Sequence, residues 1–303
     1  MRVLVTGCNG FIGHSICSSF HSAGHEVYGL GRASNPVFSG LQSYFQTDLC
    51  AGGLNRFLAQ QPVDVVIHAA GAASVAGSYS SPVDDFRANV LSWMVLLDSI
   101  KNSCSGAKAV LLSSAAVYGN ASSEPLDEAH ATAPVSPYGH HKALAESISK
   151  EFSSCFGMDV LCFRLFSVFG ERQRRLLLWD TFSKLRRNPA EQVFDGTGEE
   201  ARDYLWVEDL ARILSEVIPK MDCNGYTVMN IARGEATTVS QLVHYVKDAL
   251  KVDTQIRFSG RERLGDPKKL AADISILKSM QTSHLVLPIL SSIVECISKW
   301  QKT

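Results

Sequence analysis

Short apolar runs alternate with longer segments of helical periodicity, and this alternation constrains the fold more than any other feature of the sequence. Four longer segments between the runs, among them PYGHHKALAESISKEFSSCFG, repeat apolar residues at the spacing of amphipathic helices. Regular strand–helix alternation predicts an α/β fold with a doubly wound parallel (Rossmann) sheet and right-handed crossovers. Six runs have the length and composition of buried strands: RVLVTG, HEVYGLG, SYFQTD, VDVVIHAA, AKAVLLSS and MDVLCFRLF.

The alternation loses its regularity in the second half of the chain. We expect residues 1–165 to form the sheet domain, to which strands and helices from later segments can return. Residues 166–303 are expected to form mainly a smaller α/β lobe beside the carboxyl ends of the strands. Parallel sheets of this kind bind their ligands in a crevice at the carboxyl ends of the strands. The second lobe is therefore expected to complete a substrate site there.

Composition and charge exclude several other classes of protein. The net charge of −1 over 303 residues gives no electrostatic reason to expect a nucleic-acid or membrane partner. None of the eight cysteines forms a CxxC pair, so no metal site is expected. A charged and apolar leader and an 18-residue apolar stretch are both missing from the sequence. We therefore expect a soluble, cytoplasmic protein with reduced cysteines.

The segment VTGCNGFIG joins the first predicted strand to the first predicted helix. Its glycines have the spacing GxxGxxG, in which Gly7 permits a tight turn and Gly10 lets the backbone approach a pyrophosphate. Gly13 allows the helix to pack closely on the strand. The amide groups at the helix start, including those of Phe11 and Ile12, would then face the phosphates of a dinucleotide.

A tyrosine and a lysine stand four residues apart in SPYGHHKALAE, and this spacing puts Tyr138 and Lys142 on one helical face. A lysine cation near a tyrosine favours the phenolate and lowers its pKa, which suits proton exchange with an alcohol or a carbonyl. Ser114, at the end of the strand AKAVLLSS, could hydrogen-bond the same oxygen, and Ser113 is the neighbouring candidate. This combination is typical of carbonyl–alcohol interconversion beside a nicotinamide.

The phosphate loop, the serine strand and the Tyr-x-x-x-Lys helix, in this order, resemble the extended short-chain dehydrogenase/reductase family. The resemblance covers residues 2 to about 295 and implies a catalytic triad of Ser114, Tyr138 and Lys142. Ser114 is preferred because it stands four residues before Tyr118 in SAAVY, where the family places its catalytic serine or threonine.

Two further segments resemble the family's cofactor contacts. DVVIHAAGAASV is similar to the strand and loop that pass beneath the dinucleotide, which implicates Ala69, Ala70 and Gly71. TDL places Asp48 and Leu49 where relatives contact the adenine. Tyr138 and Lys142 are expected to contact the cofactor as well.

Residues inside the catalytic turn depart from the family's pattern. His140 and His141 stand between the tyrosine and the lysine, where relatives more often have small residues. We assign these histidines no role and expect them to face solvent.

The second half of the chain resembles the branch of the family that acts on nucleotide-diphosphate sugars. FRLFSVFGERQR is similar to the R-x-x-N-V-x-G-P segment of epimerases and dehydratases, with Ser167 in place of Asn and Glu171 in place of Pro. GTGEEARDYLWVEDLA and RERLGDPKKLAAD resemble segments whose arginines meet the substrate diphosphate. The resemblance thus implies Ser114, Ser167, Arg202 and Arg263 as substrate-binding residues, since arginine forks suit phosphate.

Two helices carry more apolar surface than one sheet face needs, PVDDFRANVLSWMVLLDSI and PYGHHKALAESISKEF. In the family the equivalent pair forms a four-helix dimer interface. We therefore expect a homodimer through these helices.

Two residues beside the catalytic serine exclude one of the reactions known in this branch of the family. The 4,6-dehydratases of this branch carry an Asp-Glu pair where this chain has Ala115 and Ala116, and neither alanine can transfer a proton. Two reactions remain: reduction of a 4-keto (deoxy)sugar with NADPH, and NAD-dependent 4-epimerisation through a transient 4-ketone. A regulator that binds the cofactor without catalysis is disfavoured by the Tyr–Lys pair.

The end of the second strand decides between these two reactions at the sequence level. NAD-selective relatives end this strand with an acidic residue, whereas this chain has Gly31 and Arg32. A carboxylate would repel a 2′-phosphate and Arg32 would attract it. The sequence thus favours NADP and the 4-ketoreductase, with NAD and the 4-epimerase as the alternative.

Overall fold

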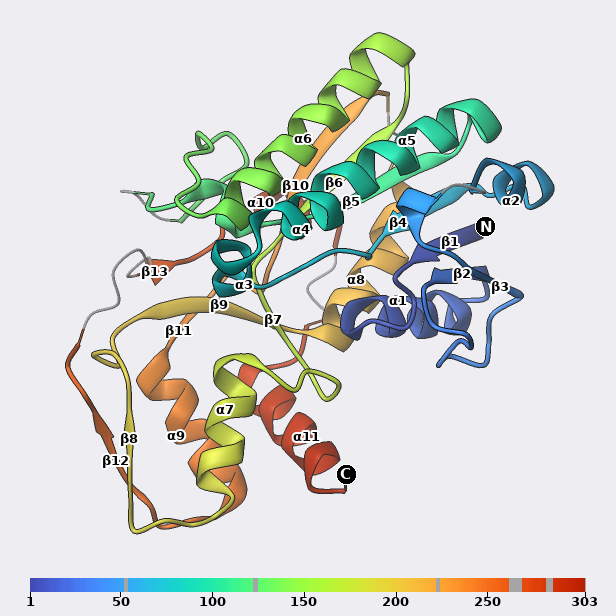
Figure 1. Ribbon diagram of the computed structural model, residues 1–303. Helices are drawn as coiled ribbons and strands as arrows, with labels where there is room; N and C mark the ends of the chain where they lie inside the picture. The colour runs from blue at the N-terminus through green and yellow to red at the C-terminus, as the bar shows by residue number, and fades with distance from the viewer. Residues whose placement is uncertain (52–53, 122–124, 222–223, 262–268, 282–285, 303) are drawn as a thin grey trace.

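The computed structural model describes residues 1–51, 54–121, 125–221, 224–261, 269–281 and 286–302. Its largest unit is a seven-stranded sheet of order β10-β6-β5-β4-β1-β2-β3, in which every pair is parallel (Figure 1). The predicted doubly wound parallel sheet is therefore confirmed. The strands are β1 (Arg2–Thr6), β2 (Glu26–Gly31), β3 (Ser43–Gln46), β4 (Val65–His68), β5 (Lys108–Ser114), β6 (Val160–Leu165) and β10 (Tyr226–Ile231).

Helices cover both faces of this sheet (Figure 1). On one face α1 (Phe11–Ser22) packs against α8 (Val207–Lys220), and on the other α5 (Ser92–Ser103) packs between α2 (Leu54–Gln60) and α6 (Pro137–Phe156).

The alternation of side chains along β1 explains why both faces are apolar. Val3 and Val5 belong to the core beneath α1 and α8, whereas Leu4 belongs to the core beneath α5 and α6. Successive side chains of a strand point to opposite faces, so a strand that is covered on both sides must be apolar throughout.

Short elements connect the strands at the carboxyl edge of the sheet. They are η1 (Leu49–Ala51), α3 (Val75–Ser80), α4 (Pro82–Phe86) and η3 (Ala115–Tyr118). The short helix α10 (Ser275–Ser279), from the end of the chain, packs against β10. A π-helical turn, η2 (Arg87–Leu91), joins α4 to α5.

Two parts of the sheet domain differ from the pattern in the sequence. The strand predicted in SYFQTD is β3, an edge strand with no fully buried residue, because it has a neighbour on one side only. The seventh strand, β10, lies some 60 residues after β6 along the chain, yet it pairs with β6 from Tyr226↔Val160 to Ile231↔Leu165. The chain thus returns to the sheet after building part of the second lobe.

The second lobe lies below the sheet domain in Figure 1. Its helices share a core that includes Phe182, Val243, Ile293 and Trp300. Its strands are short, and this explains why the strand–helix alternation loses its regularity in this half of the sequence. The lobe consists of β7 (Ser167–Phe169), α7 (Leu176–Leu185), β8 (Glu191–Phe194), β9 (Ala201–Trp206), β11 (Ala236–Thr238), α9 (Val239–Leu250), β12 (Gln255–Phe258), β13 (Lys269–Leu270) and α11 (Ile289–Gln301).

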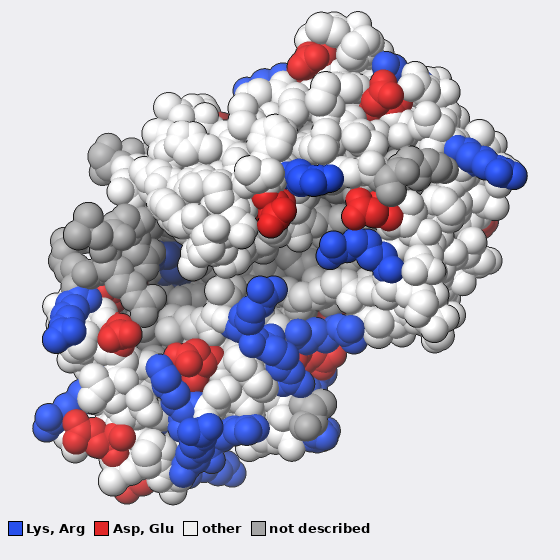
Figure 2. Space-filling model, in the orientation of Figure 1, with Lys and Arg blue, Asp and Glu red and all other residues white. Residues whose placement is uncertain are grey.

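A hollow separates the two parts of the molecule on the face shown in Figure 2. Lys and Arg side chains gather along its lower side, which belongs to the second lobe. Among the described residues, no helix is long and apolar enough to cross a membrane.

Candidate functional site

The site begins where the strand order of the sheet reverses. β1 and β4 are neighbours in space, but the chain leaves them toward opposite faces, and this opens a crevice at their carboxyl ends. The hydroxyl of Thr6, the last residue of β1, accepts a 3.3 Å hydrogen bond from the amide of Ala70. This hydrogen bond joins the loop after β1 to the loop after β4, so the two loops lie side by side at the base of the crevice.

The glycine loop is packed too tightly for side chains. Gly7 has a φ of +66°, and a Cβ there would lie 2.7 Å from the Ala70 backbone. A Cβ at Gly13 would lie 2.2 Å from the carbonyl oxygen of Gly7. These approaches bring the start of α1 against the loop, as GxxGxxG predicts.

The amino-terminal end of α1 suits an anion. Gly10 is its N-cap and no described side chain caps it, so the amides of Phe11 and Ile12 begin the helix without such a partner. Unsatisfied amides at a helix start, together with the helix dipole, favour phosphate. The residues present thus fit the pyrophosphate of a dinucleotide.

The end of β2 offers no carboxylate to a ribose. Arg32 is exposed, and its carbonyl accepts a 3.2 Å hydrogen bond from Gln46 Nε2. A Cβ at Gly31 would lie 3.0 Å from the hydroxyl of Tyr44, which donates to the carbonyl of Ala33. Tyr44 therefore limits the space for any side chain at Gly31.

The residues expected near the adenine and beneath the cofactor follow β3 and β4. Asp48 is exposed and its Oδ1 accepts a 2.9 Å hydrogen bond from the amide of Cys50, whereas Leu49 is buried in the core. Ala69 and Ala70 are half-buried in the loop after β4. A Cβ at Gly71 would lie 2.8 Å from Asn89 Oδ1, so this loop lies close to the helical segment of η2 and α5.

The three predicted catalytic side chains come from β5 and α6. Ser114 ends β5, and its hydroxyl accepts a 3.2 Å hydrogen bond from the amide of Ala116. Tyr138 is the second residue of α6, which begins at Pro137 with the Ser136 hydroxyl as N-cap. The Lys142 amino group lies 5.9 Å from the centre of the Tyr138 ring. The fold therefore brings tyrosine and lysine together, as their spacing predicts.

Burial controls the proton affinities of this pair. It raises the pKa of Tyr138, and the neighbouring Ser114 hydroxyl lowers it by hydrogen bonding. Burial also lowers the pKa of Lys142 to about 8, while its amino group donates a 3.0 Å hydrogen bond to the Leu112 carbonyl. Burial therefore dominates, and the pKa of Tyr138 lies above its usual value in the protein alone. That the Lys142 charge lowers this pKa stays a prediction.

An ion pair that the sequence analysis missed lies one turn beyond Lys142. Glu146 accepts hydrogen bonds from Ser113 Oγ at 2.6 Å and from Arg164 Nη2 at 2.8 Å, and both charged side chains are 4% exposed. These contacts tie α6 to β5 and β6 directly beneath the triad. The hydroxyl of Ser113, the alternative catalytic serine, already donates its hydrogen bond to Glu146, which favours Ser114 as the catalytic serine.

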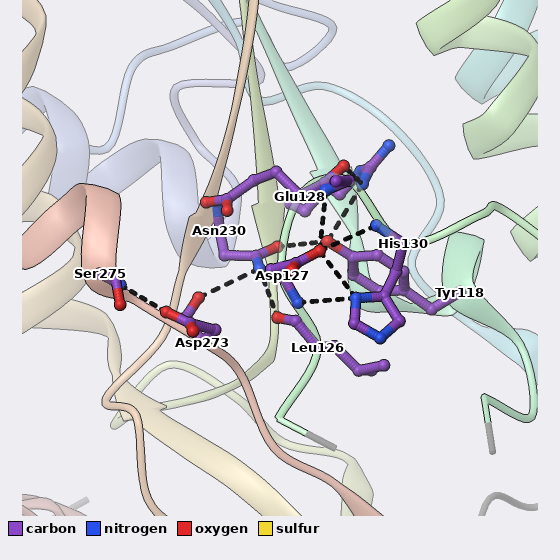
Figure 3. Close-up of polar contacts among 10 residues, drawn as sticks. Tyr118, Leu126, Asp127, Glu128, His130, Asn230, Asp273 and Ser275 are labelled. Carbon is purple, nitrogen blue, oxygen red and sulfur yellow. Dashed lines mark hydrogen bonds and ion pairs between the residues drawn. The ribbon is translucent and has the colours of Figure 1, made fainter. Parts of the chain in front are cut away.

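The same cluster extends to the loop after η3 and to β10 at the edge of the sheet (Figure 3). Arg164 Nη1 donates to the Tyr118 hydroxyl at 3.0 Å, and that hydroxyl donates to Asn230 Oδ1 at 2.7 Å. Asn230 in turn donates through its side chain to the Leu126 carbonyl and through its backbone to Glu128 Oε1. Because Asn230 belongs to β10, this network fixes the returning strand to the loop after η3.

Two of the predicted substrate residues, Ser167 and Arg202, lie on strands of the second lobe. Ser167 is half-buried on β7 and stands opposite Tyr204 of β9. Arg202 lies two residues before Tyr204, is half-buried, and donates from Nη1 to the Ala201 carbonyl at 2.7 Å. Arg263 lies outside the described residues. The structure thus brings Ser167 and Arg202 into one strand pair beside the crevice.

The two histidines of the catalytic turn behave differently. His140 is exposed, as expected. The prediction that His141 faces solvent is wrong, because its side chain is only 13% exposed and lies 2.5 Å from Asp85 Oδ2. The carboxylate that holds it comes from α4, more than 50 residues earlier, so sequence spacing gave no sign of the contact.

Fold and site together define a dinucleotide-binding α/β enzyme with a Ser–Tyr–Lys arrangement. Among the described residues, no group of three or more His, Cys, Asp or Glu side chains could hold a metal ion. Residues 3–232 match the NAD dependent epimerase/dehydratase family. The chain belongs to this family, which confirms the resemblance to extended short-chain dehydrogenases/reductases.

Curated relatives match about nine tenths of the chain. An uncharacterized UDP-glucose epimerase of Bacillus subtilis is 26% identical over 295 residues, with 92% of each chain covered. A UDP-glucose 4-epimerase of Azospirillum brasilense is 28% identical over 295 residues, covering 89% of this chain and 83% of the relative.

Solved structures of UDP-sugar 4-epimerases are also similar to this chain. The UDP-N-acetylglucosamine 4-epimerase of Methanobrevibacter ruminantium, in complex with UDP-N-acetylmuramic acid, is 28% identical with a TM-score of 0.86, covering 99% of this chain and 98% of that one. The UDP-glucose 4-epimerase of Thermus thermophilus, in complex with NAD, is 25% identical with a TM-score of 0.87 and covers 99% of each chain.

Proposed function

We propose that this protein is an NAD-dependent nucleotide-sugar 4-epimerase that works on UDP-hexoses through a transient 4-ketone. The observation that carries the proposal is the Ser114–Tyr138–Lys142 arrangement beside Ala115 and Ala116, in a chain whose relatives are named 4-epimerases. The relatives favour the epimerase, our alternative, over the 4-ketoreductase that Arg32 suggested.

Each residue has a distinct part in this reaction. Tyr138 accepts the proton of the sugar hydroxyl at C4 and returns it when the ketone is reduced. Ser114 hydrogen-bonds the same oxygen, and the Lys142 ammonium favours the phenolate form of Tyr138. Arg202 would bind the diphosphate. A bound NAD would supply a reversible hydride acceptor, so the cycle would have no net redox change.

Interconversion of UDP-glucose and UDP-galactose by the purified protein, without added dinucleotide, tests this function. We expect both directions to proceed to the same equilibrium mixture. An enzyme that instead consumes NADPH stoichiometrically with a 4-keto sugar, and leaves both UDP-hexoses unchanged, would overturn the proposal in favour of the reductase.

The cofactor site is expected to accept NADP as well as NAD, because the end of β2 carries a cation where a carboxylate would exclude the 2′-phosphate. Exposed Arg32 can reach that phosphate with a charge-assisted hydrogen bond. We expect Arg32→Ala to weaken NADPH binding about tenfold and to leave NADH binding unchanged. Titration of both dinucleotides by fluorescence measures this, with Arg32→Lys as the charge-preserving control. An equal loss of affinity for NADPH and NADH would show that Arg32 does not contact the 2′-phosphate.

We further propose a homodimer through α4, α5 and α6. Large apolar side chains on these helices are exposed, namely Val83 (69%), Phe86 (40%), Met94 (43%) and Leu144 (46%). An apolar face of this kind is typical of a protein interface.

Replacing Leu144 with glutamate places a charge on this face, so we expect the variant to be monomeric by sedimentation while the parent protein is a dimer. Leu290→Glu is the matched control, because Leu290 is 45% exposed on α11, away from this face. A monomeric parent protein, or dimers of Leu144→Glu, would contradict the proposed interface.

A further inference from the structure

Asp85 is a buried carboxylate beside the catalytic helix, and nothing in the reaction described above uses it. It belongs to α4 and its side chain is 3% exposed. Its Oδ2 lies 2.5 Å from His141 Nδ1. Its Oδ1 is buried and has no hydrogen-bond partner among the described residues. Burying a carboxylate costs free energy unless a neighbouring group compensates it, and His141 is the group in contact.

The pair connects α4 to the turn of α6 that carries the chemistry. His141 stands between Tyr138 and Lys142, and the Phe86 ring meets its imidazole edge-on at 5.5 Å. A second contact holds the same turn, because the Ser78 hydroxyl of α3 accepts a 3.1 Å hydrogen bond from the Tyr138 amide. The elements before α5 therefore fix the first turn of the catalytic helix at two points.

Asp85 is close enough for its charge to act on both catalytic groups. Its negative charge raises the pKa of Tyr138, on top of the larger effect of burial. It also raises the pKa of Lys142 and so opposes the lowering by burial. An uncompensated carboxylate thus favours the phenol over the phenolate that a base requires.

Other charged or titratable groups near the pair come from the elements packed around it. Asp84 and Arg87 flank Asp85 along the chain but are exposed. From α6, His140 is exposed, Lys142 is buried, and Glu146 is engaged by Arg164. From β4, burial lowers the pKa of His68 to about 3, so this histidine is neutral. His141 is therefore the titratable group that faces the Asp85 carboxylate directly.

We propose that the His141–Asp85 ion pair is a positioning and electrostatic control element for Tyr138, which fixes the catalytic turn and sets the pH at which the phenol ionises. The imidazolium neutralises Asp85, so the carboxylate strengthens the helix contact without holding the proton on Tyr138. This inference rests on the proposed role of Tyr138 as the base.

Two substitutions at the pair are expected to move the ionisation of Tyr138 in opposite directions. Asp85→Asn removes the negative charge and keeps the shape, so the ionisation shifts to lower pH. His141→Gln keeps a donor for the carboxylate but removes the compensating cation, so the ionisation shifts to higher pH. Each shift is expected to be about one pH unit or less.

The measurement is a pH titration of tyrosinate absorbance in the intact protein, with and without NAD, from which the titration of the Tyr138→Phe variant is subtracted. The difference isolates one tyrosine and needs no sugar turnover, so it remains readable if the epimerase assay fails. The acidic limb of the kcat profile is expected to shift in the same order. His140→Gln is the matched control, because this neighbouring histidine is exposed, and it should leave the titration unchanged.

Opposite shifts for the two variants, with an unchanged His140→Gln protein, support the proposal. Unchanged ionisation in both variants, or shifts in the same direction, would overturn it and leave the pair a structural contact only. Circular dichroism of each variant shows whether it is folded. If Asp85→Asn does not fold, His141→Gln decides the question by the direction of its shift.

Discussion

Replacing Tyr138 with phenylalanine is expected to lower kcat for UDP-hexose epimerisation by about 10²- to 10⁴-fold, the range lost when a positioned general base is removed. The substitution deletes one oxygen from a side chain that is 8% exposed and leaves its ring in place. The protein should therefore fold normally and retain NAD. Initial rates at saturating UDP-glucose, together with the dinucleotide content of the purified variant, measure both effects.

Tyr79→Phe provides the control for this substitution. Tyr79 also lies next to α6, and its hydroxyl donates to the Val135 carbonyl, but it is 62% exposed. Its loss should change kcat less than twofold. Full activity in Tyr138→Phe would rule out Tyr138 as the catalytic base.

Replacing Arg164 with alanine is expected to lower the free energy of unfolding by about 3–5 kcal/mol, because it leaves a buried carboxylate without its cation. Arg164 holds Glu146 by two hydrogen bonds, from Nε at 3.1 Å and from Nη2 at 2.8 Å. It also supports Tyr118 and thereby the network of Figure 3. Urea unfolding followed by circular dichroism gives the change in free energy.

The matched control is the exposed ion pair of Arg2 with Asp64, which has a similar N–O distance of 2.7 Å. Its side chains are 39% and 41% exposed, so Arg2→Ala is expected to lower the free energy of unfolding far less than Arg164→Ala. Equal losses for Arg2→Ala and Arg164→Ala would mean that burial does not determine the strength of the inner pair.

The sheet domain could be predicted because its signals are local. Each strand of the first half is a short apolar run, and GxxGxxG and Tyr-x-x-x-Lys lie at fixed spacings within single elements. The pairing of β10 with β6 could not be predicted, because the two strands lie far apart along the chain. Where a strand pairs depends on the path of the chain, which no local pattern records.

The polar interactions beneath the site could not be predicted for the same reason. Arg164 interrupts the apolar run VLCFRLF, and a charge inside a buried strand signals that a partner is needed. The sequence does not identify Glu146 as this partner, nor Asp85 as the partner of His141. The raised pKa of Tyr138 follows from burial, which the spacing of tyrosine and lysine does not reveal.

The central claim is that hydride leaves C4 of the sugar and returns to the same carbon within one active site. Incubating the protein with UDP-glucose deuterated at C4, and measuring the label in the product by mass spectrometry and NMR, tests it most directly. We predict UDP-galactose that retains the deuterium at C4, even with excess unlabelled NADH in solution. No UDP-galactose, or product whose C4 label has been replaced by hydrogen, would contradict the account.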